Sequence, residues 1–145
     1  MPRGKKRKAG RFIAIILVFM LLPLTYFSVK TTLMLYYLRD CGLGLRELPA
    51  AMDVAGGKSD GVTVKNIGND SVFIGRPDTG YYYDIIEKNG CKYYDQAGAC
   101  TRFEHKNIPS KHLSITRHSC NRWFAVYGLG GTTYTIEDLM ENAGS

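Results

Sequence analysis

The pattern of apolar and polar positions divides the chain into three parts. Residues 12–29 form one unbroken apolar run without a charged side chain. In residues 39–59, apolar positions recur every three or four residues, which predicts a short amphipathic helix. From residue 60 to the end, apolar and polar residues alternate in short runs separated by Gly, Asn, Asp and Pro, which predicts β-strands joined by turns.

The apolar run has the length and composition of a membrane-spanning helix. As a helix, residues 12–29 extend about 27 Å, close to the roughly 30 Å thickness of the hydrocarbon core of a bilayer. Residues 30–38 are again largely apolar and contain Tyr36 and Tyr37, which suit the membrane interface. We therefore predict a transmembrane signal-anchor helix over residues 12–38, whose last part is an interfacial extension.

A cleaved signal peptide and a buried helix of a soluble protein are the two alternatives for this run. A signal peptide needs small residues before its cleavage site, whereas bulky residues such as Tyr26, Phe27 and Val29 follow Pro23. The length of the run and its basic flank disfavour a buried soluble helix. An uncleaved anchor is the interpretation that we prefer.

Basic residues on the N-terminal side of the run predict its orientation. Residues 1–11 contain six basic residues and no acidic one. Because positively charged flanks stay in the cytoplasm, we predict a cytoplasmic tail over 1–11. The rest of the chain is then the periplasmic or extracellular part of a single-pass protein of the cell membrane. The determinants of this topology are Arg3, Lys5, Lys6, Arg7, Lys8 and Arg11.

The formal net charge of +6 comes entirely from this tail. The chain has 19 Lys and Arg residues and 13 Asp and Glu residues, so removal of the six basic tail residues leaves 13 against 13. A domain that binds nucleic acid needs a basic surface on its folded part. The neutral remainder therefore argues against nucleic acid as a partner.

Residues 39–59 predict a stalk that contains the short amphipathic helix. Gly42 favours the end of the membrane helix, Pro49 is acceptable near a helix start, and Gly56 favours a helix end. The apolar stripe of this helix has three possible contacts, namely the bilayer, a helix of a partner, or the following domain. Packing on its own domain is the default expectation.

Turn signals place several hairpins in residues 60–145. Asn69 lies in a Gly-Asn-Asp turn between two β-rich runs within residues 61–75. Asn89-Gly90 lies between residues 81–87 and 91–95, and Asn-Gly between β-rich runs is a strong hairpin signal. We expect each of these runs to be a strand.

The remaining elements complete an α+β domain. Further strands are expected at residues 101–105, 112–116 and 122–127, and Gly128 to Gly131 should break the last one. Thr135, followed by acidic residues, predicts the start of a helix that ends near Asn142. The predicted fold class is α+β, with an N-terminal single transmembrane helix and a small antiparallel β-rich domain that ends in a short C-terminal helix.

Four cysteines follow the predicted membrane span, and they suggest disulfide bonds. An even number of cysteines in a small extracytoplasmic domain is typical of such bonds. Cys91 and Cys100 are close in sequence, so their pairing closes the shortest loop and leaves Cys41 to pair with Cys120. The alternative is that Cys41 joins a second chain in a covalent dimer.

No motif in the chain indicates catalysis or a bound metal. The spacing of His105, His112 and His118 matches no zinc-binding pattern. The chain has no nucleophile elbow, phosphate loop, metalloprotease motif or dinucleotide fingerprint. We therefore expect neither a cofactor, nor a metal, nor an enzymatic activity.

Consecutive aromatic residues suggest an interaction surface. On a strand, side chains alternate between the two faces, so a run of three tyrosines places rings on both. Either both faces of the sheet are covered, or some rings are exposed to a protein or glycan partner. The candidate surface consists of Tyr81, Tyr82, Tyr83, Tyr93, Tyr94 and Trp123.

These features together favour a non-enzymatic membrane protein. We expect its extracytoplasmic domain to be a structural or adaptor subunit of a membrane or envelope assembly. Its partners would be other membrane or envelope proteins, or a second copy of the chain. The alternative is a surface module that binds glycan or peptide through the aromatic surface, and a small extracytoplasmic enzyme is the least favoured reading.

Overall fold

The computed structural model describes residues 4–106 and 108–144, and it leaves out the side chains of residues 4–14, 108–111 and 120. The chain forms two compact units, Met1–Tyr36 and Tyr37–Ser145. The topology determinants lie outside this description: Arg3 entirely, and Lys5, Lys6, Arg7, Lys8 and Arg11 in their side chains.

The chain contains four α-helices, one short 3₁₀ helix and six strands within the described residues. In chain order they are α1 (Gly4–Asp40), η1 (Leu45–Glu47), α2 (Leu48–Ala55), β1 (Gly61–Ile67), β2 (Asp70–Gly75), α3 (Thr79–Lys88), β3 (Cys91–Ala97), β4 (Cys100–His105), β5 (Ile108–Cys120), β6 (Ala125–Gly130) and α4 (Ile136–Gly144). The predicted α+β class, with a long apolar helix first and a short helix last, is confirmed.

Helix α1 is long and apolar enough to cross a bilayer. The stretch Ile15–Asp40 meets this condition by length and composition, and it does so alone among the described helices. The apolar side chains of residues 15–29 are exposed, with exposed fractions from 47% at Ile16 to 74% at Phe19. No part of the described chain therefore covers this surface.

A glycine ends α1, as the sequence predicts. Gly42 has a φ angle of +71°, which favours glycine. Its N–H donates to the Arg39 carbonyl (3.0 Å), and the Leu43 N–H donates to the Leu38 carbonyl (2.9 Å). This pair of bonds satisfies carbonyl groups that a helix end otherwise leaves without partners.

The predicted amphipathic helix packs on its own domain. Ala51 and Val54 of α2 are buried, and α2 contacts β1 and β2. Ile74 and Val126 are paired across β2 and β6, and both are buried. They lie outside the main core cluster, since their strand neighbours Phe73 and Tyr127 point to the other face.

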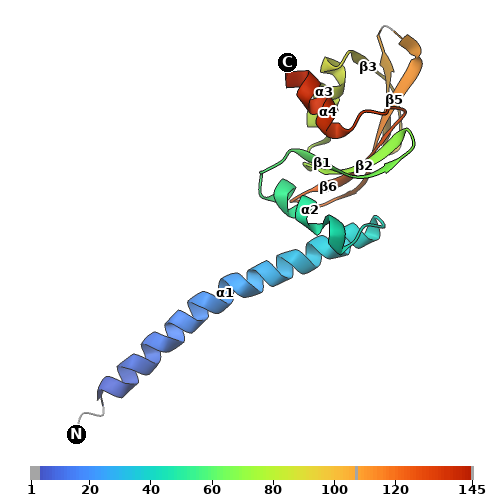
Figure 1. Ribbon diagram of the computed structural model, residues 1–145. Coiled ribbons are helices and arrows are strands. Elements are labelled where there is room, and N and C mark those ends of the chain that lie inside the picture. Colours follow the sequence, from blue (N-terminus) through green and yellow to red (C-terminus); the bar gives the residue numbers. More distant parts are fainter. Residues whose placement is uncertain (1–3, 107, 145) are drawn as a thin grey trace. The chain divides into compact units, whose positions relative to one another are not determined.

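The six strands form one antiparallel sheet in the order β1-β2-β6-β5-β4-β3. Helices α3 and α4 lie together against one face of this sheet (Figure 1). The core between the sheet and these helices is apolar. Its main members are Phe73, Phe103, Leu113, Ile115, Tyr127 and Leu129 from the strands, and Tyr82, Ile85, Ile86, Ile136 and Leu139 from the helices.

The prediction of a strand over residues 81–87 is wrong, because this segment belongs to helix α3. The Asp78 carboxylate accepts a hydrogen bond from the Gly80 N–H (3.0 Å) and so caps the helix. The buried residues Tyr82, Ile85 and Ile86 follow helical spacing. Asn89-Gly90 is thus a helix end and not a hairpin turn. Aromatic and β-branched residues are typical of strands, which explains the wrong prediction. The Asp78 cap and the helical spacing of the buried residues favour a helix instead.

The strand predicted over residues 122–127 is shifted toward the C-terminus. The Asn121 side chain accepts hydrogen bonds from the N–H groups of Trp123 (2.8 Å) and Phe124 (3.0 Å), which makes this segment a turn. Strand β6 then runs through Gly128 and Gly130, which were expected to break it. A Cβ atom at Gly128 would lie 2.8 Å from the His118 Nε2. Glycine here leaves room for that side chain across the sheet.

The other turn and cap predictions are confirmed. β1 and β2 form the hairpin expected within residues 61–75, and Gly68 at its turn has a φ angle of +62°. The Thr135 hydroxyl accepts a hydrogen bond from the Asp138 N–H (3.3 Å) at the start of α4, and the Asp138 carboxylate accepts one from the Thr135 N–H (2.8 Å). This reciprocal pair has the form of a capping box.

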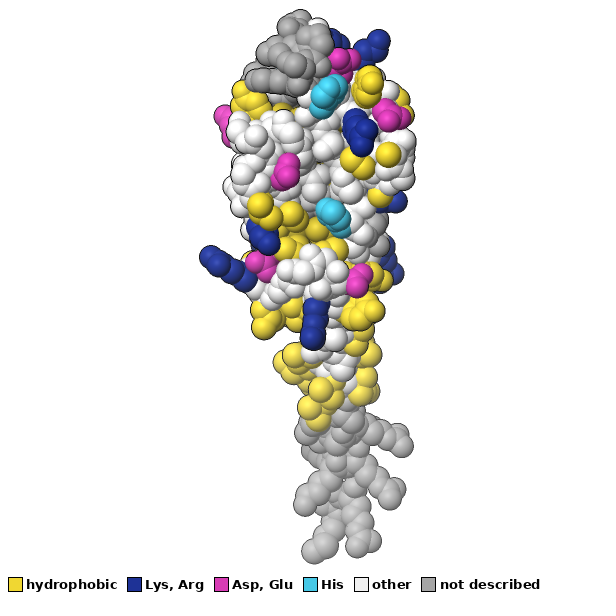
Figure 2. Space-filling view, turned by 90° about the vertical axis from the view of Figure 1, so that its right-hand side faces the viewer, with side chains coloured by type: hydrophobic (Ala, Val, Ile, Leu, Met, Phe, Trp, Pro, Cys, Tyr) yellow, Lys and Arg dark blue, Asp and Glu magenta, His cyan; other side chains and the backbone are white. Residues whose placement is uncertain are grey.

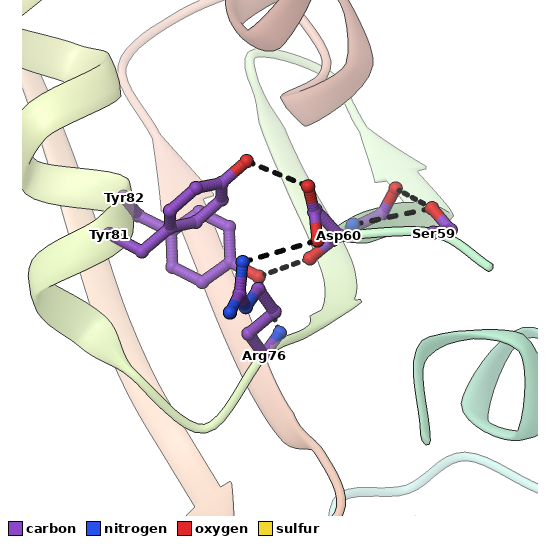
Figure 3. Close-up of polar contacts among 6 residues, drawn as sticks. Ser59, Asp60, Arg76, Tyr81 and Tyr82 are labelled. Atoms are coloured by element: carbon purple, nitrogen blue, oxygen red, sulfur yellow. Dashed lines mark hydrogen bonds and ion pairs between the residues drawn. The ribbon is translucent and has the colours of Figure 1, made fainter. Parts of the chain in front are cut away.

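Tyr82 joins α3 to the adjacent ends of β1 and β2 (Figure 3). Its ring is fully buried against Phe73 and Tyr127, at centroid distances of 5.1 and 5.0 Å. Its hydroxyl donates to the Asp60 carbonyl (2.5 Å) and accepts from the Arg76 N–H (2.5 Å). Burial raises the pKa of the Tyr82 hydroxyl, so it stays protonated and keeps its role as donor.

Gly75 makes this contact possible, and its replacement should destabilise the fold. A Cβ atom at Gly75 would overlap the Tyr82 hydroxyl and approach the Phe73 ring to 3.0 Å. We expect Gly75→Ala to lower the free energy of unfolding by about 1–3 kcal/mol, the usual cost of overpacking a core. Chemical denaturation of the full-length protein measures this change.

Two further variants make the test specific. Gly144→Ala adds the same methyl group where no atom lies within 4 Å, so it should leave stability nearly unchanged. In a Tyr82→Phe background, Gly75→Ala should cost less, because the overlapping oxygen is gone. Equal costs for Gly75→Ala in both backgrounds would contradict the proposed contact.

Candidate functional site

A cleft lies where α4, the loop before it and the ends of several strands meet. Its volume is about 740 Å³, which is within the range of small-ligand sites, about 300–1,000 Å³. Its described lining residues come from six separate chain segments. They are Asn69, Asn89, Cys91, His105, His112, Leu113, Gly131, Thr132, Thr133, Tyr134, Leu139 and Asn142.

The loop that forms one wall of the cleft is fixed at both ends. The Gly131 N–H donates to the Asp70 carboxylate (3.2 Å), and the Thr132 N–H donates to the Asn69 carbonyl (3.1 Å). The Tyr134 N–H donates to the Thr132 hydroxyl (3.1 Å). Gly131 also has a φ angle of +77°, and a Cβ there would overlap the carbonyl oxygen of the neighbouring strand β5. The loop is therefore held in one conformation before any ligand arrives.

Asn89 connects the two helices beside the cleft. Its Nδ2 donates to the Ile85 carbonyl in α3 and to the Leu139 carbonyl in α4, both at 2.9 Å. Both side-chain N–H groups are thus used to hold α4 against the end of α3. Asn89 has a structural role here, and its carbonyl oxygen is the part that remains for a ligand.

The cleft places Cys91 near His105, its register partner on β4. The Cys91 side chain is 6% exposed. Burial raises the pKa of its thiol, and the nearby Lys106 charge lowers it to a smaller extent. Because the thiolate is the reactive form, a buried neutral thiol is a poor nucleophile. This pair therefore lacks the activated character of a catalytic Cys and His.

No charged residue occurs among the described residues that line the cleft. Likewise, no group of three or more His, Cys, Asp or Glu side chains in the described part of the chain is arranged to hold a metal ion. What the cleft offers instead is uncharged hydrogen bonding, from amide, hydroxyl and imidazole groups. Such groups can donate hydrogen bonds to a polar ligand and accept them from it.

The histidines are divided between two places. His105 and His112 line the cleft, whereas His118 lines a smaller hollow of about 410 Å³ together with Cys41 and Asp40. In that hollow, burial raises the pKa of the Cys41 thiol. A hydrogen bond with Ser119 lowers it, and the Asp40 charge raises it further. This thiol is again neutral.

The surface charges of the domain are interspersed. Three ion pairs join exposed groups, namely Lys58–Asp53 (3.4 Å), Arg76–Asp60 (3.4 Å) and Arg102–Asp95 (4.0 Å). On the face that Figure 2 shows, Lys and Arg side chains alternate with Asp and Glu side chains over the domain. This distribution agrees with the neutral charge count of the sequence outside the tail.

The predicted aromatic surface is not a single patch. Tyr82 is buried, and Tyr81 and Tyr83 are half-buried on α3. The Tyr81 hydroxyl donates to the Asp60 carboxylate (2.9 Å) (Figure 3). The Tyr83 hydroxyl is hydrogen-bonded to the Thr101 hydroxyl (2.6 Å). Tyr93 and Tyr94 are exposed on the edge strand β3. Trp123 lies in the turn between β5 and β6, with the Arg122 guanidinium 4.6 Å from its ring centroid. The hairpin interpretation thus joined residues that have separate roles.

The predicted pairing of Cys91 with Cys100 is wrong. Cys91 lies opposite His105 and Cys100 opposite Ala97, at the two ends of the β3–β4 hairpin. Six strand residues at about 3.3 Å each separate the two cysteines by about 20 Å, whereas a disulfide needs Cα atoms about 4.4–6.8 Å apart. Both thiols are free, and so is that of Cys41. The side chain of Cys120, the predicted partner of Cys41, lies outside the described residues.

The sequence contains few signals that predict the residues lining this cleft. The sequence predicts a turn at Asn69 and a helix end near Asn142, and it assigns no function to Thr133 or Tyr134. The one available signal is a run of turn and hydrogen-bonding residues between the last strand and the capped helix, over residues 131–135. Such a run predicts a loop, but not what lies across from it.

Comparison with known proteins adds no relative: no family model, no curated protein and no solved structure matches the chain.

The thiols provide a test of the cleft geometry and of the strand register. Peptide mapping of the alkylated native protein should find no link between Cys91 and Cys100. Because the pKa of Cys91 is raised, its alkylation rate should still increase above about pH 9, where an ordinary thiol with a pKa of about 8.5 levels off.

Cys100 is the internal control, since it lies on the same hairpin and is less buried. It should react faster than Cys91 in the folded protein, and both should react alike after unfolding in urea. Recovery of a Cys91–Cys100 cross-linked peptide would show that the register of β3 and β4 is not the one described.

Proposed function

We propose that this protein is a non-enzymatic single-pass membrane protein. Its domain Tyr37–Ser145 serves outside the cytoplasm as a structural or adaptor subunit of a membrane or envelope assembly. One observation carries the proposal: the apolar side chains of residues 15–29 in α1 are exposed, and no described part of the chain covers them. A compact folded unit follows this helix directly.

The energetics of the helix support insertion into a bilayer. Residues 15–29 include ten Leu, Ile, Phe or Val residues. Each contributes about −0.3 to −0.6 kcal/mol at the centre of a membrane helix, so together they contribute roughly −3 to −6 kcal/mol. In water the same surface would promote aggregation. The bilayer is therefore the environment that this helix requires.

The charge distribution supports the orientation and the kind of partner. The basic tail favours a cytoplasmic N-terminus, and the rest of the chain is neutral with interspersed charges. A domain without net charge suits proteins or uncharged ligands better than nucleic acid. The uncharged cleft with its neutral thiol supports a non-enzymatic role.

Membrane insertion and orientation can be tested together in cells. The full-length protein should stay with the membrane after alkaline carbonate extraction. Alkaline phosphatase fused after Ser145 should be active, because that enzyme folds only outside the cytoplasm. Replacement of the six basic tail residues by Gln should reduce this activity, because the positive charges set the orientation.

Release of the protein by carbonate would contradict the membrane anchor. An inactive phosphatase together with a fluorescent cytoplasmic reporter at the same position would contradict the orientation alone. A variant in which Lys58, Lys65 and Lys88 are replaced by Gln is the matched control, since it removes basic charge from the domain and should not change the topology.

The role in an assembly is tested in native membranes. After extraction in a mild detergent, the protein should elute in a complex larger than its monomer, and chemical cross-linking should identify a partner on the domain. Replacement of residues 15–29 by an unrelated apolar helix of equal length should preserve the complex if the domain makes the contact. A lone monomer without cross-links would overturn the adaptor role.

A further inference from the structure

The cleft is lined in part by polar side chains that have no partner among the described residues. The side chains of Asn69, Thr133, Tyr134 and Asn142 line the cleft and make no hydrogen bond within the described part of the chain. By contrast, both side-chain N–H groups of Asn89, which also lines the cleft, are bonded to main-chain carbonyls. Hydrogen-bonding groups that the fold does not use, gathered around one cleft, are available to a ligand.

Hydrogen bonds hold the backbone that carries three of these groups. Thr133 and Tyr134 belong to the loop whose two ends are fixed to the β1–β2 turn and to the start of α4. Asn69 lies in the β1–β2 turn itself, and its carbonyl accepts the hydrogen bond from the Thr132 N–H that fixes one end of the loop. Because this backbone is already fixed, a ligand has to order the side chains but not the loop.

The composition of the lining selects an uncharged ligand. A charged ligand would lose hydration in the cleft without gaining an opposite charge, since no described lining residue is charged. Amide and hydroxyl groups both donate and accept hydrogen bonds, which matches ligands with several neighbouring hydroxyl groups. The chemistry of the cleft therefore favours a neutral ligand rich in hydroxyls.

Tyr134 adds an aromatic surface at the rim. Its side chain is 56% exposed although it belongs to an otherwise fixed loop. An exposed ring with an apolar face and a polar tip is well suited to a ligand that has both apolar C–H and polar O–H surfaces. A pyranose ring has these two kinds of surface.

A peptide fits the cleft less well. Extended peptides commonly bind by adding a strand to a free sheet edge. The described cleft lining takes only Cys91 from the edge strand β3 and no residue from the edge strand β1. The main-chain hydrogen bonds that such peptides need are therefore not offered here.

We propose that this cleft is a binding site for a neutral oligosaccharide, which stacks on Tyr134 and is hydrogen-bonded by Asn69, Thr133 and Asn142. The volume of about 740 Å³ has room for a short oligosaccharide. This site lies wholly within Tyr37–Ser145, so it does not depend on the membrane anchor or on its orientation.

The test uses the full chain in phosphatidylcholine nanodiscs, because detergents with sugar headgroups would compete for the cleft. Chitotriose, cellotriose and maltotriose are titrated as neutral probes, and trigalacturonic acid as a charged one, with binding followed by isothermal calorimetry. We expect at least one neutral trisaccharide to bind with a dissociation constant of millimolar or below, and tighter than trigalacturonic acid.

Matched variants locate the site. Tyr134→Ala should weaken binding by about tenfold, because it removes the stacking surface. Asn142→Ala should weaken it by about fivefold, the effect of one lost hydrogen bond. Tyr93→Ala removes a ring of similar exposure (49%) from β3, outside the cleft lining, and should leave binding unchanged.

Three results would overturn the proposal. The first is that none of the neutral trisaccharides binds at millimolar concentration. The second is that trigalacturonic acid binds more tightly than all of them. The third is that Tyr93→Ala abolishes binding while Tyr134→Ala does not, which would place the ligand on the edge strand. Thermal melting of each variant shows whether it is folded, and Asn142→Ala provides the test if Tyr134→Ala is not.

Discussion

The contact between Tyr82 and Gly75 holds the domain together. Tyr82 is the first large buried residue of α3, and its hydroxyl bridges the ends of β1 and β2. Full burial of such a ring contributes about 1.5–3 kcal/mol, and the hydroxyl avoids the cost of a polar group left unpaired in the core. The contact exists only because Gly75 has no side chain. It therefore fixes the position of the first turn of α3 over the ends of β1 and β2.

The position of α3 in turn determines the cleft. Asn89 follows α3, and its amide reaches the Leu139 carbonyl in α4. Helix α4 is thereby held near Cys91, the first residue of β3, and both contribute to the lining of the cleft. The capped start of α4 also sets where the loop with Tyr134 ends. A shift of α3 along the sheet would therefore change the walls of the cleft as well as the core.

The apolar helix and the cleft lie in different parts of the chain and suit different surroundings. Residues 15–29 of α1 expose apolar side chains that suit lipid, whereas the cleft belongs to a unit with a neutral surface. In the proposed function, the apolar helix would keep a neutral binding domain at the membrane, where it would meet an uncharged partner. The proposed saccharide site lies within Tyr37–Ser145 and does not require the membrane helix.

The sequence alone determined those features that depend on nearby residues. The long apolar helix that contains residues 12–29, the β1–β2 hairpin and the Thr135 cap were all predicted correctly, because apolar length, turn residues and helix caps act over a few positions. Tyr81 to Glu87 was misread as a strand, because its β-rich composition outweighed the Asp78 cap and the helical spacing of Tyr82, Ile85 and Ile86. Only the tertiary structure showed that Cys91 and Cys100 lie at opposite ends of a hairpin, and that Asn69, Tyr134 and Asn142 meet around one cleft. Those facts depend on strand register and helix packing, which arise from contacts between residues far apart in the chain.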